Sequence, residues 1–215
     1  MKNALLRKLS ALLLAASMLF SFVLTGCSKG KDIITDDGVA VPGGMQLISP
    51  STVDYYLFVS EDWKADISTG VVTAYRSDTD PTNICMMSFG LKDMTMTYSE
   101  YWDSYEDQFK AIYNNFEMVE ESETILGGNT AGKYVYTATF FGGSSDTTAA
   151  ESEEAETADT AETDKTSGGV DYKFMTIVVV KNGSVYILTY TALASAYDNN
   201  VSDFTEAVKN FRFKD

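Results

Sequence analysis

The clearest helical pattern in the chain begins at a capping-box sequence. Thr97 and Glu100 have the spacing at which each side chain satisfies a backbone N–H group of the other. Apolar side chains then recur every three or four positions, the spacing of one face of a helix. They are Tyr98, Tyr101, Trp102, Tyr105, Phe109, Ile112, Tyr113 and Phe116. We expect this face to pack in the core; a platform on which a ligand stacks is the alternative.

The strongest strand signal is the Asn-Gly dipeptide at 182–183. Both residues of a type I′ hairpin turn need positive φ, which Asn and Gly tolerate. Pairing outward from this turn places Val180 opposite Val185 and Val178 opposite Ile187. Both faces of the hairpin are apolar, so both must be covered. The pattern therefore predicts a central position in a layered domain.

Shorter apolar runs predict the other elements. Strands are expected at Tyr55–Val59, Val71–Tyr75, Asn83–Leu91, Met118–Ile125 and Thr130–Phe141. A closing helix is expected near Val201–Val208. Together these elements predict an α+β fold, a mostly antiparallel sheet with helices packed on it, within a single domain at 45–215.

One segment inside this domain, 142–169, has no periodicity. It contains no aromatic residue, and its eight acidic residues stand against a single lysine. Such a composition does not bury enough apolar surface to offset the entropy lost on ordering. We predict an acidic disordered insertion between two strands; a short Ala/Glu helix is the alternative.

The N-terminus has the pattern of a secretion signal. Basic residues within 2–8 precede an apolar run at 11–23, which is shorter than the ~20 residues of a membrane-spanning helix. The run leads into Leu24-Thr25-Gly26-Cys27, which resembles the lipobox of bacterial lipoproteins. The resemblance implies cleavage between Gly26 and Cys27 and lipid attachment to the Cys27 thiol. An ordinary secretory signal with a chance cysteine is the alternative.

These features predict the order of the chain. Residues 1–26 are a lipoprotein signal peptide, and residues 27–44, punctuated by glycine, are a lipidated tether. The partner predicted first is the membrane itself, through the anchor at Cys27. The expected location is the extracytoplasmic face of the cell membrane.

Composition excludes several kinds of chemistry. The formal net charge of −15 opposes binding to nucleic acid. The chain contains no histidine, so it has no Ser-His-Asp triad, Cys-His pair or His-ligated zinc site. With Cys27 lipidated, Cys85 has no disulfide partner in the chain, and we expect it to be a small buried hydrophobe. Asp78 opens an apparent calcium loop, but Asn83 and Phe89 occupy its essential glycine and glutamate positions, so a turn is predicted.

The order of elements resembles a known family. The residues that carry the likeness are 56–63, the aromatic helix from Tyr98 to Phe116, 127–131, the hairpin at 182–183 and 210–213. They resemble the PsbP-like (Mog1/PsbP) α/β/α sandwich, found in small bacterial lipoproteins and in extrinsic proteins of photosystem II. The resemblance implies a binding or assembly-accessory module, without a catalytic signature and without naming a ligand. We expect no cofactor.

Three hypotheses for function follow. The first is a membrane-anchored binding or structural accessory module whose partner is an envelope protein or polymer. The second is a carboxylate- or metal-dependent enzyme acting on envelope polymers. The third is a sensor whose acidic insertion takes up divalent cations. The missing histidine and nucleophile motifs favour the first.

Overall fold

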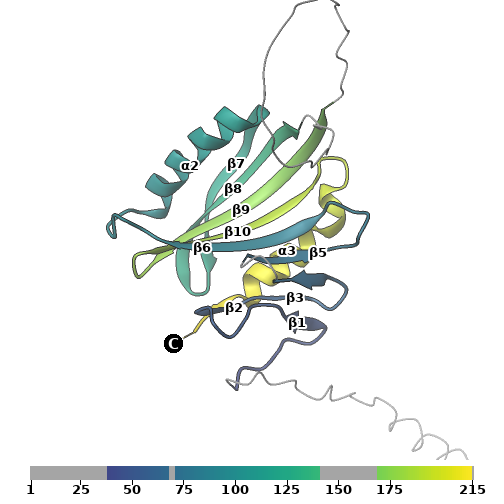
Figure 1. Ribbon diagram of the computed structural model, residues 1–215, viewed down its shortest axis with the longest axis vertical. Helices are drawn as coiled ribbons and strands as arrows, with labels where there is room; N and C mark the ends of the chain where they lie inside the picture. Colours follow the sequence, from purple (N-terminus) through teal and green to yellow (C-terminus); the bar gives the residue numbers. More distant parts are fainter. Residues whose placement is uncertain (1–37, 68–70, 141–168, 215) are drawn as a thin grey trace, which may run out of the picture. The chain divides into compact units, whose positions relative to one another are not determined.

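The computed structural model describes residues 38–67, 71–140 and 169–214 (Figure 1). The chain divides into two units, 1–43 and 44–215, and the second carries every described helix and strand. The signal peptide and its sites, Gly26 and Cys27, lie outside the described residues, as does nearly all of the acidic segment 142–169.

The unit is mostly strand, with two helices. The elements are β1 (Met45–Leu47), β2 (Tyr55–Tyr56), β3 (Phe58–Ser60), β4 (Lys64–Asp66), β5 (Val72–Tyr75), β6 (Asn83–Gly90), α2 (Tyr98–Ile112), β7 (Asn114–Leu126), β8 (Asn129–Phe140), β9 (Val170–Lys181), β10 (Ser184–Leu193), α3 (Tyr197–Asn210) and β11 (Arg212–Phe213).

The main sheet has seven antiparallel strands in the order β4-β5-β6-β10-β9-β8-β7. Its centre is the β9–β10 hairpin, which confirms the position predicted from two apolar faces. Val180 pairs with Val185, and Val178 pairs with Ile187. Asn182 has a φ of 52° in the turn, as the Asn-Gly dipeptide predicted. The chain is therefore α+β, with α2 on one face of the sheet and α3 on the other.

The face below α2 is an aromatic layer. Its centre is Trp102, which stacks on Tyr134 with ring centroids 3.9 Å apart and planes 6° from parallel. A β-carbon on Gly132 would lie 2.5 Å from the Tyr134 hydroxyl, so the ring takes the space that a side chain would fill. The buried members of this layer are Trp102, Tyr134, Tyr136, Ala138, Phe174, Val178, Val185 and Ile187.

The opposite face packs against α3 and the short N-terminal strands. Phe204 and Ala207 of α3 are fully buried there. The Trp63 indole N–H donates to Asp203 of α3 at 2.8 Å, which ties the loop after β3 to the helix. The C-terminal strand β11 pairs with β2, so the two ends of the unit meet on this side.

The capping box is present as predicted, but the helix is shorter than its aromatic pattern. Thr97 caps α2, and the backbone turns to an extended conformation at Tyr113. The side chain of Ile112 is 70% exposed, which corrects its assignment to the core face. Phe116 lies in β7 and stacks on Tyr136 with ring centroids 5.2 Å apart. Phe116 therefore joins the same aromatic layer from a strand. Its position in the sequence has the spacing of one more helical turn, although the backbone there is extended.

The predicted strand at 55–59 is two strands. β2 pairs with β11 and β3 pairs with β1, and neither belongs to the main sheet. Leu57, between them, is fully buried and donates its backbone N–H to the Ser49 hydroxyl at 3.1 Å. One continuous apolar run therefore contributes strands to two separate two-stranded sheets.

The stacked indole predicts a large stability difference between two positions of α2. We expect Trp102→Ala to lower the free energy of unfolding by about 3–5 kcal/mol, because it empties a buried aromatic site. The matched change Ile112→Ala, at an exposed position of the same helix, should shift it by less than about 0.5 kcal/mol. Urea unfolding of both variants gives the comparison, and equal losses would contradict this packing.

The buried tyrosines predict that the folded state loses stability at high pH. Burial, with a hydrogen bond to Asp54, raises the pKa of Tyr186 to about 12, and burial raises the pKa of Tyr190 to about 12. Their folded-state pKa values exceed the ordinary 10, so their contribution to stability is complete below pH 10 and is lost as pH rises toward 12. We expect unfolding in this window, with tyrosinate absorbance rising together with the loss of secondary structure. Complete tyrosine ionisation in a protein that stays folded would contradict it.

Candidate binding face beside α3

The α3 side of the sheet presents a polar surface on its outer strands. Ala131 and Val135 of β8 belong to the core on the α3 side. Residues directly opposite each other in an antiparallel pair share a face, so their partners Thr124 and Glu120 of β7 point to the same side. The Lys133 ammonium donates to Glu120 at 2.8 Å, and this contact holds the pKa of the Glu120 carboxyl below its usual range.

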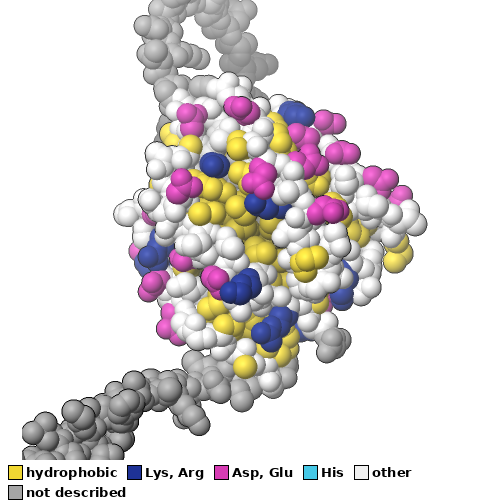
Figure 2. Space-filling view, turned by 180° about the vertical axis from the view of Figure 1, so that it is seen from behind, with side chains coloured by type: hydrophobic (Ala, Val, Ile, Leu, Met, Phe, Trp, Pro, Cys, Tyr) yellow, Lys and Arg dark blue, Asp and Glu magenta, His cyan; other side chains and the backbone are white. Residues whose placement is uncertain are grey.

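The surface shown in Figure 2 mixes apolar and charged side chains. Hydrophobic side chains are exposed across the middle of the view, with lysine and arginine side chains among them. Acidic side chains gather mainly toward its upper right. A surface of this kind offers apolar contact and charge side by side.

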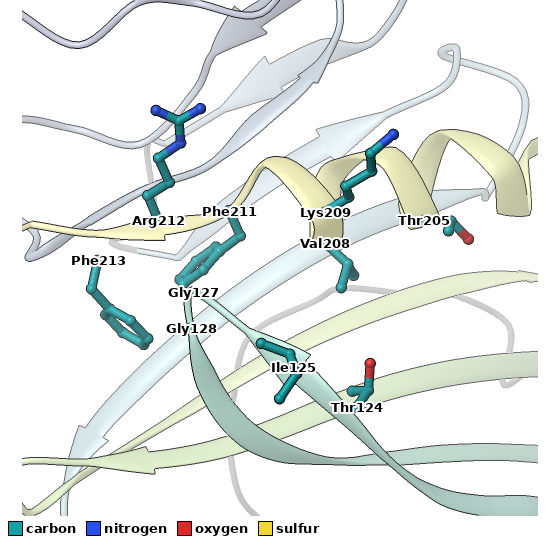
Figure 3. A pocket seen from close by; sticks show the side chains of 10 residues that line it. All are labelled: Thr124, Ile125, Gly127, Gly128, Thr205, Val208, Lys209, Phe211, Arg212 and Phe213. Atoms are coloured by element: carbon teal, nitrogen blue, oxygen red, sulfur yellow. The ribbon is translucent and has the colours of Figure 1, made fainter.

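The first hollow lies at the C-terminal end of α3. It has a volume of about 710 Å³ and is lined by Thr124, Ile125, Gly127, Gly128, Thr205, Val208, Lys209, Phe211, Arg212 and Phe213 (Figure 3). Gly127 has a φ of +54°, and a β-carbon there would lie 2.7 Å from the Phe213 ring. Glycine therefore permits both the β7–β8 turn and the close approach of the C-terminal strand.

The two sides of this hollow differ in chemistry. Figure 3 shows Lys209 and Arg212 extending away from the β7–β8 turn, while Val208 and Phe211 extend toward it. Alternation along an extended segment explains why Arg212 points away from its phenylalanine neighbours. The hollow thus has cations along one side and apolar side chains along the other.

The second hollow lies at the other end of β7. It has a volume of about 280 Å³ and is lined by Asn115, Glu117, Thr137, Ala138, Thr139, Asp171 and Ala194. The Asn115 amide donates to the Thr139 hydroxyl at 3.2 Å, which donates to the Asp171 carboxylate at 2.6 Å. A register shift in β7 and a φ of 53° at Asn115 direct the amide toward this chain of contacts. These contacts satisfy the polar groups locally.

A third hollow of about 710 Å³ lies beside β4 and β5 and includes the predicted turn at Asp78–Pro81. Asp80 accepts a hydrogen bond from the Thr82 N–H at 2.9 Å, as in an Asx turn. Lys64 pairs with Asp78 at 2.7 Å, with both side chains largely exposed. Among the described residues, no group of three or more His, Cys, Asp or Glu side chains is placed to hold a metal ion.

Cys85 occupies a mid-sheet position on β6, opposite Thr73 and Thr189. It lies in a strand as expected, but it is half-buried, whereas a buried small hydrophobe was expected. Burial raises the pKa of its thiol, against the smaller effect of a hydrogen bond with Thr73. A raised pKa keeps the sulfur in its unreactive thiol form at neutral pH.

Cys27 and Gly26, the site residues predicted from the sequence, lie outside the described residues. The hollow at the end of α3 was not among the predicted sites. The available signal was the alternating Phe211-Arg212-Phe213 triplet, whose period places one cation opposite two rings. Within the described ranges, no helix has the length and hydropathy needed to cross a membrane.

No protein-family model matches the chain, and the comparison with curated proteins found no match. The chain is similar in structure to the cyanobacterial PsbP protein CyanoP from Synechocystis sp. PCC 6803, with a TM-score of 0.51 and 12% identity over 84% of this chain and 97% of CyanoP. Weaker likenesses link it to a Pseudomonas aeruginosa protein of unknown function, with a TM-score of 0.47 and 10% identity over 78% of this chain and 96% of that one. LpqN of Mycobacterium tuberculosis, involved in cell envelope biogenesis, has a TM-score of 0.44 and 14% identity over 75% of this chain and 83% of LpqN. The fold is PsbP-like.

The second hollow generates a prediction about Thr139. Its hydroxyl is the link between Asn115 and Asp171, and Thr139 is buried. Thr139→Val keeps the shape but removes both hydrogen bonds, so we expect a loss of about 1–3 kcal/mol in the free energy of unfolding. Thr137→Val, two positions earlier on the same strand, makes the same chemical change where no side-chain hydrogen bond exists among the described residues. Chemical unfolding of the two variants should separate them, and equal stability would show that the hydrogen-bonded chain contributes nothing.

Proposed function

We propose that this protein is a cell-envelope lipoprotein, anchored through Cys27 on the extracytoplasmic face of the membrane, and that its PsbP-like domain is a binding or structural accessory module. The observation that carries the proposal is the sequence Leu24-Thr25-Gly26-Cys27, placed directly after an apolar run of signal-peptide length. Two acyl chains on one residue give stable attachment, whereas a single chain gives only reversible binding.

The surface of the domain supports a binding role. The hollow at the end of α3 joins apolar side chains to cations. An anchor confines the domain near its membrane partner, so that weak binding suffices. The chemistry of the chain also favours binding over catalysis, because histidine is absent and the Cys85 thiol is held in its protonated form.

The anchor has a matched test within the chain, which contains two cysteines. We expect Cys27→Ala to abolish incorporation of radiolabelled palmitate in bacteria and to leave uncleaved precursor or released protein. Cys85→Ala should keep the label and the membrane location. Incorporation of label by the Cys27→Ala protein would refute the anchor.

The accessory role has a test in two parts. In intact cells, we expect a crosslinker to capture an envelope protein or polymer. In vitro, we expect the purified full chain to show no turnover of peptidoglycan, lipid or peptide substrates. Turnover that stops when a single carboxylate is changed, in a variant that still folds, would favour the enzyme hypothesis instead.

A further inference from the structure

The two edges of the main sheet differ greatly in length. Strand β4 at one edge has three residues, whereas β7 at the other edge (Figure 1) has thirteen. Within the described ranges, β7 pairs with β8 along one side and with no strand along the other. Alternate residues of an edge strand direct their backbone N–H and C=O groups away from the sheet, where another chain can pair with them. The main sheet therefore has one long edge at which a strand can be added.

The second half of this edge has a regular register. Two register shifts lie in the first half, between Asn114 and Glu117 and between Met118 and Glu120. From Glu120 to Leu126, every residue has a partner on β8. A regular stretch of this kind rises about 3.4 Å per residue, so it is as long as an ordinary strand. The backbone at 120–126 is therefore suited to receive an added strand.

The side chains along the edge are exposed on both faces of the sheet. Residues 119–123 are all exposed, whereas the neighbouring strand β8 is mostly buried. Two of the exposed residues of β7 are apolar, since Val119 is 55% exposed and Ile125 is 57% exposed. An added strand would remove part of this apolar surface from water, which favours its binding. It would do so without displacing any strand of the described sheet.

The edge strand is strongly acidic. It contains four glutamates, Glu117, Glu120, Glu121 and Glu123, and no lysine or arginine. The Lys133 ammonium pairs with Glu120 at 2.8 Å. The other three glutamates are exposed and have no ion pair among the described residues. The negative charge of the edge therefore persists after its ion pair is counted.

The helix packed beside this edge does not neutralise it. Helix α2 contains a single basic residue, Lys110, which pairs with Glu106 at 3.1 Å. Burial first, and then charges that include those of Glu121, Asp103 and Glu106, raise the pKa of the Tyr134 hydroxyl. Carboxylates of β7 and α2 therefore lie near the same ring. The side of β7 that faces α2 is acidic on both elements.

Two of the glutamates share one face of the strand. Glu121 lies opposite Tyr134 and Glu123 lies opposite Gly132, so both point to the α2 side. A strand added antiparallel to β7 would place two of its residues, separated by one, opposite these carboxylates. Lysine or arginine at both positions would form cross-strand pairs of opposite charge. A second copy of β7 added about Ser122 would instead place Glu121 of one chain opposite Glu123 of the other, which is destabilising.

We propose that the β7 edge binds an extended segment of an envelope protein with lysine or arginine at alternate positions, and that this segment joins the sheet as a further strand. The proposal rests on the binding role proposed above and gives the chemistry of its partner. In this mode of recognition, main-chain hydrogen bonds provide affinity and alternate side chains provide specificity. The glutamates of β7 thus oppose pairing between two copies of the chain and select a basic partner.

The test uses the purified full chain and a fluorophore-labelled peptide of about nine residues. Lysine occupies every second position of the peptide, with threonine and valine between. Two further versions carry N-methyl groups on alternate backbone amides, one version on the odd positions and the other on the even positions. A methyl group removes the N–H donor, so it blocks pairing only where that amide faces β7. Fluorescence anisotropy measures the dissociation constants, and NMR measures hydrogen exchange at the backbone amides of β7.

We expect one N-methylated version to bind about tenfold more weakly than the parent peptide, and the other to bind within about twofold of it. The parent peptide should slow hydrogen exchange at alternate amides of 120–126. The double change Glu121→Gln and Glu123→Gln should weaken binding about fivefold. The matched control Glu61→Gln and Asp107→Asn removes two charges at exposed positions outside the edge, and it should change binding by less than about twofold.

Failure of the parent peptide to bind would overturn the proposal and leave the glutamates as protection of the edge alone. Equal binding by all three peptides would also overturn it, because charge would then act without strand pairing. So would binding that the Glu121 and Glu123 changes leave intact. Self-association of the chain with protected β7 amides would assign the edge to a second copy instead. Capture of an envelope partner in cells, without peptide binding at β7, would uphold the binding role and refute only this inference.

Discussion

The β9–β10 hairpin has apolar side chains on both faces, and this constraint organises the domain. Val178 and Ile187 face the aromatic layer under α2, while Ile177 and Leu188 face α3. Each face needs a cover that is itself amphipathic, because its outer side meets water. One cover is a helix whose buried centre is Trp102, and the other combines α3 with short strands from the N-terminal part of the unit. The layered architecture follows because both apolar faces of the hairpin must be covered.

Sequence reasoning succeeded where a feature is local. The Asn-Gly turn, the register that extends from it and the Thr97 capping box depend on neighbours within a few residues, and all three are present. It failed where distant segments decide the structure. Phe116 keeps helical spacing but lies in a strand, since the backbone becomes extended at Tyr113. The apolar run at 55–59 divides because its halves meet different partners, β11 and β1.

The candidate binding face shows the same limit. Ile125, Lys209 and Arg212 come from a strand, a helix and the C-terminal strand, and only the packing of α3 beside the β7–β8 turn brings them to one hollow. The alternation Phe211-Arg212-Phe213 marks only the C-terminal strand, and no spacing along the chain brings Ile125 to it. The lipobox is the opposite case, because a peptidase reads it as a linear sequence. The sequence therefore supports a proposal about attachment.

The pairing of Phe140 with Val170 has a consequence for engineering. The sheet holds the two ends of the intervening segment side by side, so a replacement of different length would begin and end at fixed neighbouring points. The entropy of closing such a loop grows only with the logarithm of its length. A fluorescent reporter domain whose own termini lie close together could therefore be inserted here with little strain on β8 and β9. The domain thus carries a natural insertion point between β8 and β9.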